Sequence, residues 1–269
     1  MLPVHPLRQK FGLSLRRCPE PIQSPPPLVP SNQAPSSSLL SVDPILFAMT
    51  SSILLEVAIA SADDARTAAD AGADRLELNT ALELDGLTPT PAVLAATLRV
   101  GLPVVVMLRS RPGGFCYTDR ELDIMRDELE WIGGEVALGI LTNTSSIDVP
   151  RLKRFPTSRV VFHRAFDLVP DPFMALEQLI DLGIPRVMIS AADHDRIAHL
   201  IDAARERIDI LPAGGVRPEN VRQLVQRTGC TSVHGSFKRL VGNRLSPFAA
   251  HHETCGPTVR LVRSILDER

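Results

Sequence analysis

The sequence predicts an α/β fold, a (β/α)8 TIM barrel in a single domain, and three observations lead to it. Short runs of β-branched and aliphatic residues alternate with helical patterns from residue 53 onwards, eight times in about 215 residues. Hydrophobic residues make up 44% of the chain but aromatic residues only 4%, so the core is mainly aliphatic, as in a parallel sheet covered by helices. Ionisable side chains follow the run at residues 159–163, where a barrel strand places its chemistry. A doubly wound open sheet is the alternative fold.

Residues 1–48 differ from the rest of the chain and are predicted to form a disordered Pro/Ser-rich extension. They hold ten of the 23 prolines and several serine runs, a composition that buries little apolar surface. Basic residues outnumber acidic ones there, so an organelle-targeting peptide is the alternative interpretation. The barrel domain is expected over residues 49–269.

The predicted elements follow in order, each with its own boundary signals. Ser61 can cap the first helix, Pro91 opens the second and Thr118 or Asp119 caps the third, whereas Pro150 and Pro156 shorten the fourth. The strands are expected at residues 53–58, 75–79, 103–108, 136–141, 159–163, 186–190, 208–211 and 231–234. The helices are expected at residues 62–71, 91–100, 119–131, 147–155, 171–182, a segment ending at residue 205, 218–228 and 258–266.

Polar side chains are expected inside the barrel. Side chains alternate along a strand, so most strands here present one apolar face and one mixed face. The apolar faces should meet the helices, which leaves the mixed faces to line the interior. The residues that converge there are Glu56, Glu77, Arg109, His163 and Ser190. Unpaired buried charges are unfavourable, so we expect the carboxylates to pair with Arg109 or with the imidazole of His163.

Two interpretations of this polar interior compete. The first is a buried layer of ion pairs that fixes the register of the strands. The second is a catalytic site, in which His163 or a carboxylate of shifted pKa transfers a proton. Packing alone does not require five polar positions in a barrel interior, which favours the catalytic interpretation. Asp167, four residues after His163, is a further candidate for that site.

The loops after the last two strands predict an anion-binding site. Gly214 and Gly215 follow the seventh strand, and Gly235 and Ser236 follow the eighth. Free backbone N–H groups and a helix amino terminus in such loops attract an anion, although tight turns also need glycine. Arg109 or Arg164 would supply a second contact to the anion.

Several runs, in this order and spacing, resemble the CutC family of copper homeostasis proteins. The resemblance covers residues 53–240 and implies a TIM barrel, a cytoplasmic location, a role in copper handling with copper(I) as the ion, and a homo-oligomer. The runs that carry it are Glu56-Val57, residues 71–78 (AGADRLEL), Gly86 with Thr88-Pro89, residues 106–109 (VMLR), Gly113-Gly114-Phe115, residues 162–167 (FHRAFD), Gly214-Gly215-Val216 and His234-Gly235-Ser236.

The chain departs from the family at positions that matter for copper. Family members proposed to bind copper carry a thiol two residues after each of the first two strand glutamates, and these positions are Ala58 and Asn79 here. The loss of both thiolates removes the preference for Cu(I). The family's T-S-G-G run after the sixth strand corresponds to residues 189–192, where only Ser190 is kept, which weakens that part of an anion site.

A second group of ligand types suggests a metal site outside the barrel interior. His251, His252 and Cys255 lie within five residues, and Cys116 lies in a loop on the same carboxyl side of the barrel. Imidazole and thiol suit copper or zinc. The sequence has no C-x-x-C motif, and its cysteines are expected to be reduced thiols in the cytoplasm.

Composition excludes two classes of partner. The net charge is -2 without a long basic run, which argues against nucleic acid, and no apolar stretch reaches the length of a membrane span. Three functions stay open. They are a copper homeostasis protein of the CutC type, a TIM-barrel enzyme that acts on a small anionic or phosphorylated metabolite with His163 as general acid/base, and an inactive barrel that serves through partner contacts.

Overall fold

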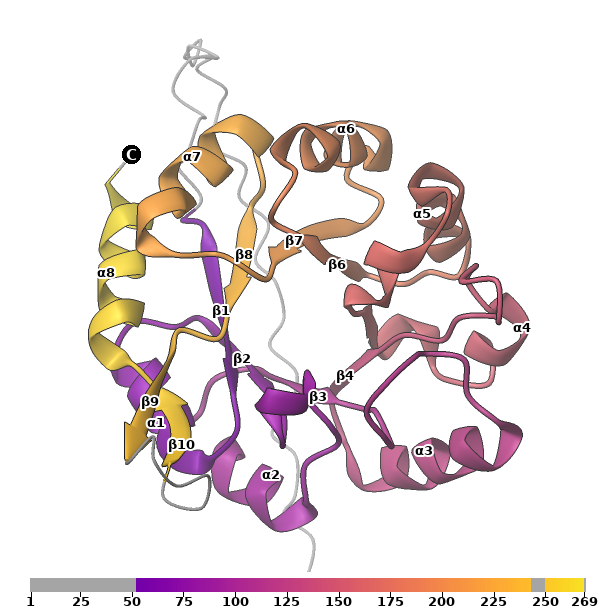
Figure 1. Ribbon diagram of the computed structural model, residues 1–269, viewed down its shortest axis with the longest axis horizontal. Helices are drawn as coiled ribbons and strands as arrows, with labels where there is room; N and C mark the ends of the chain where they lie inside the picture. The colour runs from indigo at the N-terminus through magenta and orange to yellow at the C-terminus, as the bar shows by residue number, and fades with distance from the viewer. Residues whose placement is uncertain (1–51, 243–249, 269) are drawn as a thin grey trace, which may run out of the picture. The chain divides into compact units, whose positions relative to one another are not determined.

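The computed structural model describes residues 52–242 and 250–268, and their core is a closed barrel of eight parallel strands in sequential order (Figure 1). The (β/α)8 prediction is therefore confirmed. The strands are β1 (Leu54–Ile59), β2 (Arg75–Leu78), β3 (Val104–Met107), β4 (Glu135–Leu138), β5 (Val160–Phe162), β6 (Arg186–Ser190), β7 (Asp209–Ala213) and β8 (Ser232–Gly235). The predicted disorder of residues 1–48 concerns residues outside those described, so it stays a prediction.

A ring of helices surrounds the barrel (Figure 1). They are α1 (Ala62–Asp70), α2 (Pro91–Leu98), α3 (Asp119–Trp131), α4 (Val149–Leu152), α5 (Pro172–Asp181), α6 (His194–Ala204), α7 (Pro218–Thr228) and α8 (Gly256–Asp267). Three short 3-10 helices lie in the described loops: η2 (Leu82–Leu84), η3 (Thr157–Arg159) and η4 (Arg164–Leu168). The fourth helix is a single turn, as its prolines predict. In the described part of the chain, no helix is both long and apolar enough to cross a membrane.

The helix boundaries follow local capping chemistry. Ser61 Oγ accepts the Asp64 amide at 3.0 Å, and Thr118 and Glu121 accept each other's backbone amides in a capping box at the start of α3. Proline occupies the first turn of α7, and Gly229 ends that helix with a left-handed backbone at φ 68°. These signals explain why the helices of the sequence and those of the structure agree within a few residues.

The barrel has two hydrophobic layers, and both match the alternation predicted from the sequence. Leu55, Val57 and Ile59 of β1 are buried in the outer layer, between strands and helices. The inner layer is a separate small cluster of Val105, Met107, Ala137, Val161, Met188, Leu211 and Ala213. Because this inner cluster is small, it leaves room above it, at the carboxyl ends of the strands, for polar side chains.

One element was not predicted, an antiparallel hairpin that follows β8. It consists of β9 (Lys238–Gly242) and β10 (Ala250–Thr254), and the Thr254 amide donates to Asp64 Oδ1 at 2.7 Å, which ties the hairpin to α1. Its residues are mostly exposed, so they lack the alternation of apolar and polar residues from which a strand is predicted in a sequence. The last helix also begins earlier than predicted, because Pro257 occupies its first turn.

Candidate functional site

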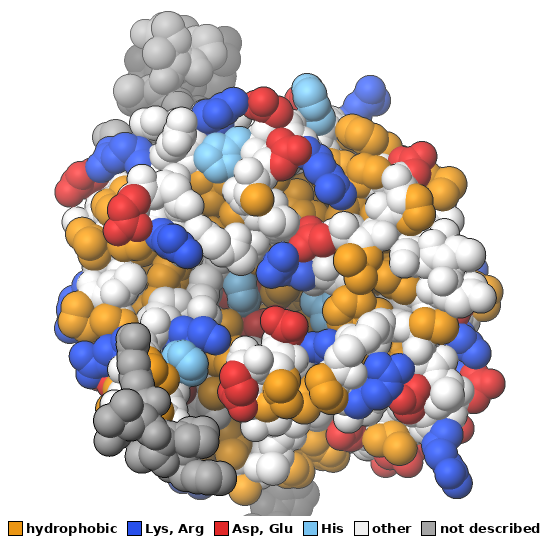
Figure 2. All heavy atoms as spheres, in the orientation of Figure 1, with side chains coloured by type: hydrophobic (Ala, Val, Ile, Leu, Met, Phe, Trp, Pro, Cys, Tyr) orange, Lys and Arg blue, Asp and Glu red, His pale blue; other side chains and the backbone are white. Residues whose placement is uncertain are grey.

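A pocket of about 920 Å³ opens at the carboxyl ends of the strands. Figure 2 shows its mouth as a hollow at the centre of this face, with histidine side chains inside and charged side chains around it. Side chains from the ends of most of the strands and from the loops after them line the pocket. Barrel enzymes place their active sites at this end of the strands.

A cluster of buried charges lies at the base of the pocket. Glu56 of β1 is fully buried and forms an ion pair with Arg75 of the neighbouring strand β2. Glu56 Oε1 also lies 2.7 Å from His234 Nδ1. The other ring nitrogen of His234 lies 3.7 Å from Glu77 Oε2, so the imidazole bridges two carboxylates. The closure of β1 against β8, with Glu56 opposite His234 in the register, produces this arrangement.

The charges of the cluster compensate one another, because each lies against an opposite charge. Burial alone would raise the pKa of Glu56, but the hydrogen bond and charge of His234 and the charge of Arg75 outweigh it and lower the pKa to about 2. Burial alone would lower the pKa of His234, yet the charges of Glu77 and Glu56 raise it above 6.5. The raised pKa favours the protonated ring, whose Nδ1 proton points to Glu56. The imidazole of His163 was predicted to pair with the carboxylates, and that prediction is wrong, because the imidazole in contact with them is that of His234.

Glu77 differs from Glu56 because it reaches the pocket. Its Oε2 accepts from Asn79 Nδ2 at 2.9 Å, while no donor among the described residues contacts its Oε1. Burial raises the pKa of this carboxyl group, with His234 acting in the opposite direction. One oxygen of Glu77 is thus held in place and the other is open to a ligand.

His163 lies in the same pocket as a neutral ring. Its Nδ1 accepts the Ala165 amide at 3.2 Å, which assigns the proton to Nε2. Burial, reinforced by the charge of Arg109, lowers the pKa of His163 to about 3. The ring of Phe115 packs against the imidazole at a tilt of 56°, with 4.8 Å between the ring centroids, and any side chain at Gly139 would overlap the imidazole. His163 Nε2 is buried and has no hydrogen-bond partner in the described part of the chain.

Arg109 does not pair with the carboxylates, so that prediction is wrong. Its guanidinium donates to the backbone carbonyls of Leu84, Asp85 and Gly86, each at 3.2 Å, and to Gly113 at 2.7 Å. It therefore holds two loops over the mouth of the pocket. Position explains the difference. Arg75 lies directly across the β1–β2 ladder from Glu56 and pairs with it, whereas Arg109 lies beyond the end of β3.

The residues predicted to bind an anion gather on another part of the rim. Gly214 and Gly215 lie in the loop before α7, and Gly235 and Ser236 follow β8. Within the described ranges, the amides of Gly214, Gly215 and Ser236 donate to no acceptor. A Cβ on Gly214 would lie 2.7 Å from Arg164 Nη1, so only glycine lets this guanidinium approach the loop.

Two cations that the sequence reasoning did not select, Arg217 and Lys238, join these amides. Both line the pocket, and neither forms an ion pair with a carboxylate of the described residues. The sequence could have indicated both residues by their positions, since each follows the end of a predicted strand by only a few residues. Asp85 and Glu219 also line the pocket, and their negative charges would repel an anion. The attraction for an anion must therefore come from the amides and the two cations.

Asp167 and Ser190 have structural partners. Asp167 pairs with Arg164 Nε at 2.8 Å and accepts the Ser190 amide at 2.7 Å. Asp167 lines the pocket, but Ser190 does not. This contact joins η4 to β6 and fixes the position of Arg164.

The predicted metal ligands outside the barrel interior are not brought together. His251 and His252 are exposed neighbours on β10, so their side chains point to opposite faces of the hairpin. Cys255 Sγ accepts from Thr258, and Cys116 is exposed in a separate loop. Among residues 52–242 and 250–268, no group of three or more His, Cys, Asp and Glu side chains could hold a metal ion.

Comparisons with known proteins identify the family. The model of the CutC family matches residues 53–239. A family protein CutC of Caulobacter vibrioides is 40% identical over 69% of this chain and 81% of its own length. The human copper homeostasis protein cutC homolog is 36% identical over 69% of this chain and 73% of its own. The solved structure of CutC from Streptococcus agalactiae superposes with a TM-score of 0.64 at 31% identity, covering 68% of this chain and 98% of that one. The chain belongs to the CutC family.

Proposed function

We propose that this protein acts in copper homeostasis, and that its own ligand is a small anionic molecule bound in the barrel pocket. The name of the human relative, a copper homeostasis protein cutC homolog, supports the first part. The observation that carries the second part is the meeting of three free amides with Arg217 and Lys238 around one pocket. Free amides and unpaired cations at a helix amino terminus are the donors that phosphate and carboxylate groups require.

The barrel interior does not fit a Cu(I) site built from thiolates. Ala58 and Asn79 occupy the positions where the family resemblance implies thiols, and both line the pocket. The soft donors present among the described lining residues are the thioethers of Met107 and Met188. His163 does not complete them, because the Ala165 amide occupies the lone pair of Nδ1 and leaves the proton on Nε2, which then has no lone pair for a metal. We therefore propose that this chain contributes to copper homeostasis by binding its anionic ligand and not by binding Cu(I) in the barrel interior.

Titration calorimetry with inorganic phosphate tests the anionic ligand. We expect saturable binding that the double variant Arg217→Ala/Lys238→Ala weakens at least about tenfold, because each charge-assisted hydrogen bond contributes roughly 1.5–3 kcal/mol. Arg239→Ala is the matched control, since Arg239 is an exposed cation on the same hairpin that pairs with Glu253 outside the pocket. Absence of binding, or equal weakening in the control, would refute the proposal.

We further place the protein in the cytoplasm as a homo-oligomer. Cys116, Cys230 and Cys255 are free thiols in the described part of the chain, which matches a reducing compartment. Leu168, Phe173 and Met174 are large apolar side chains, each about half exposed, around the start of α5. Such a patch suits contact with a second copy. Light scattering on the eluted protein measures the assembly, and a monomer would contradict it.

A further inference from the structure

The pocket holds two functional atoms that the structure leaves unused. These are the open Oε1 of Glu77 and the buried Nε2 proton of His163. The ion pairs among Glu56, Arg75 and His234 account for the stability of the base of the pocket, but they involve neither atom. A purely structural cluster gives no reason for an open carboxylate oxygen and an unpartnered N–H in one cavity.

We propose that the pocket removes a proton from a carbon next to a carbonyl group of its anionic ligand, with Glu77 as the base and His163 as the donor to the developing enolate oxygen. This proposal rests on the proposed binding of an anionic molecule and names the chemistry that the molecule undergoes. A carboxylate base opposite a neutral imidazole is a suitable pair for this reaction, because the imidazole stabilises the oxyanion without taking up a charge of its own.

Glu77 has the attachment that a base needs. Asn79 Nδ2 holds Oε2 and also donates to the Glu77 backbone carbonyl at 3.1 Å, so the carboxylate plane is fixed from its own strand. His234 lies on the same side of the carboxylate, 3.7 Å from Oε2. Burial raises the pKa of Glu77 against the lowering effect of the His234 charge, and a carboxylate of raised pKa is a stronger base.

His163 has the attachment that an oxyanion donor needs. The Ala165 amide fixes the tautomer, and the ring is held by Phe115 on one side and by the close approach of Gly139 on the other. With its pKa lowered to about 3 by burial and by Arg109, the ring stays neutral throughout the physiological range. A hydrogen bond from a fixed donor in a buried site stabilises an oxyanion strongly because it needs no reorganisation.

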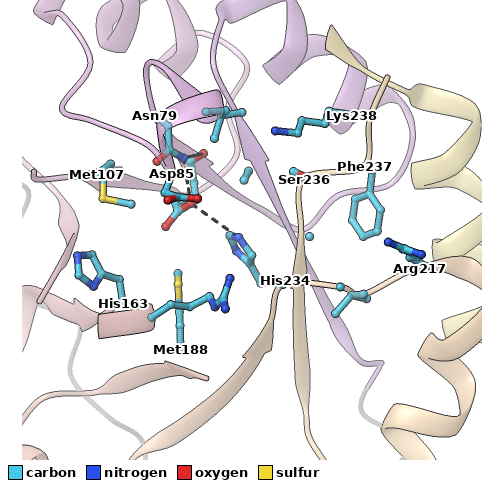
Figure 3. A pocket seen from close by; sticks show the side chains of 18 of the residues that line it. Asn79, Asp85, Met107, His163, Met188, Arg217, His234, Ser236, Phe237 and Lys238 are labelled. Atoms are coloured by element: carbon cyan, nitrogen blue, oxygen red, sulfur yellow. Dashed lines mark hydrogen bonds and ion pairs between the residues drawn. The ribbon is translucent and has the colours of Figure 1, made fainter. Parts of the chain in front are cut away.

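The positions of the labelled side chains define how a ligand would lie. Figure 3 shows His163 grouped with Met107 and Met188 on one side of the pocket, Arg217 and Lys238 on the other, and His234 between them. Glu77 contacts His234 and so belongs to the middle. A linear molecule would place its carbonyl oxygen at His163, the adjacent C–H at Glu77 and its phosphate at the two cations. A pocket of about 920 Å³ accommodates a phosphorylated ketose.

The step balances without any further reagent. Glu77 Oε1 takes the proton from the carbon, and the electron pair of the broken C–H bond forms the C=C bond of an enolate. The carbonyl π pair moves to oxygen, which accepts the hydrogen bond from His163 Nε2. Glu77 then returns a proton, exchanged with solvent, to the same carbon, so that the carbon acquires deuterium in D2O.

Proton NMR of exchange in D2O tests the proposal. The full chain is incubated with dihydroxyacetone phosphate, ribulose 5-phosphate and fructose 6-phosphate, while calorimetry measures their binding. We expect exchange next to the carbonyl of at least one probe, with Glu77→Gln slower by at least about 100-fold and His163→Phe by a similar factor. Glu130→Gln, which changes an exposed carboxylate of α3 outside the pocket lining, is the matched control and should exchange at the wild-type rate.

The outcomes separate the two proposals. If the probes bind but exchange stays at the buffer rate for all three, the carbonyl chemistry is wrong while anion binding stands. If none of the probes binds while inorganic phosphate does, the carbonyl chemistry is wrong and anion binding stands. If inorganic phosphate does not bind either, the proposed function fails and the carbonyl chemistry fails with it. Exchange that Glu77→Gln does not slow would also overturn the assignment of the base, whereas retained binding in that variant shows that the loss is catalytic.

Discussion

Replacement of Arg75 by methionine is expected to destabilise the barrel by about 3–5 kcal/mol, because it leaves a buried carboxylate without its guanidinium partner. Glu56 is fully buried and contacts only Arg75 and His234 among charged groups of the described residues. Urea denaturation of Arg75→Met and of the wild type at pH 7 measures the difference in the free energy of unfolding.

The double variant Glu56→Gln/Arg75→Met should recover part of this loss, since it removes the unpaired charge as well. Arg207→Met is the matched control, because Arg207 and Glu177 form a solvent-exposed ion pair whose loss should change the free energy of unfolding far less. A loss for Arg75→Met no larger than the loss for Arg207→Met would show that the charges at the base of the pocket do not stabilise the fold.

The second large effect is a loss of stability as the pH falls below 6.5, caused by His163. The unfolded chain protonates this residue near pH 6.5, whereas the folded chain does so only near pH 3. The unfolded state therefore binds more protons in this interval, and the free energy of unfolding falls with pH by about 1.4 kcal/mol per unit. Between pH 6.5 and pH 4.5, above the titration of Glu56, the expected contribution of His163 to the loss is about 2 kcal/mol.

The variant His163→Gln carries no titrating ring and should show a flatter profile over this interval. His252→Gln is the matched control, because His252 is exposed on β10 and should leave the wild-type slope unchanged. The measurement is the free energy of unfolding from urea titrations at four or more pH values. Equal slopes for wild type and His163→Gln would contradict the burial of a neutral His163.

The order of the elements and the two faces of each strand could be predicted from the sequence because both are local. Capping residues mark the helices, and the alternation of Val105 and Met107 with Val106 marks the inner face of β3. The partners of the buried carboxylates could not be predicted. They depend on the closure of the barrel, which sets Glu56 opposite His234 at a separation of 178 residues along the chain.

Contacts that form only in the folded chain also explain the other features that the sequence did not predict. The hairpin β9–β10 is held by one backbone ladder and a contact to Asp64, neither of which leaves an apolar pattern in the sequence. The proximity of His251 and His252 in sequence suggested a shared ligand site, but the extended backbone turns adjacent side chains apart. Gly139 was not selected either, since only the packed structure shows that it makes room for His163.

The central claim is that this CutC-family pocket serves an anionic ligand and not an interior Cu(I) ion. Anaerobic titration of the reduced protein with Cu(I) against a competing chelator tests it most directly. Three forms are compared: the wild type, the variant Cys18→Ser/Cys116→Ser/Cys255→Ser, and the variant Ala58→Cys/Asn79→Cys.

We expect that the variant Ala58→Cys/Asn79→Cys binds one Cu(I) per chain at least about 100-fold more tightly than the wild type, because it places two thiolates in the pocket lining. Any weak Cu(I) binding by the wild type should vanish in the triple serine variant. Tight binding of one Cu(I) that survives in the triple serine variant would reveal an interior copper site without these thiols and would contradict the account.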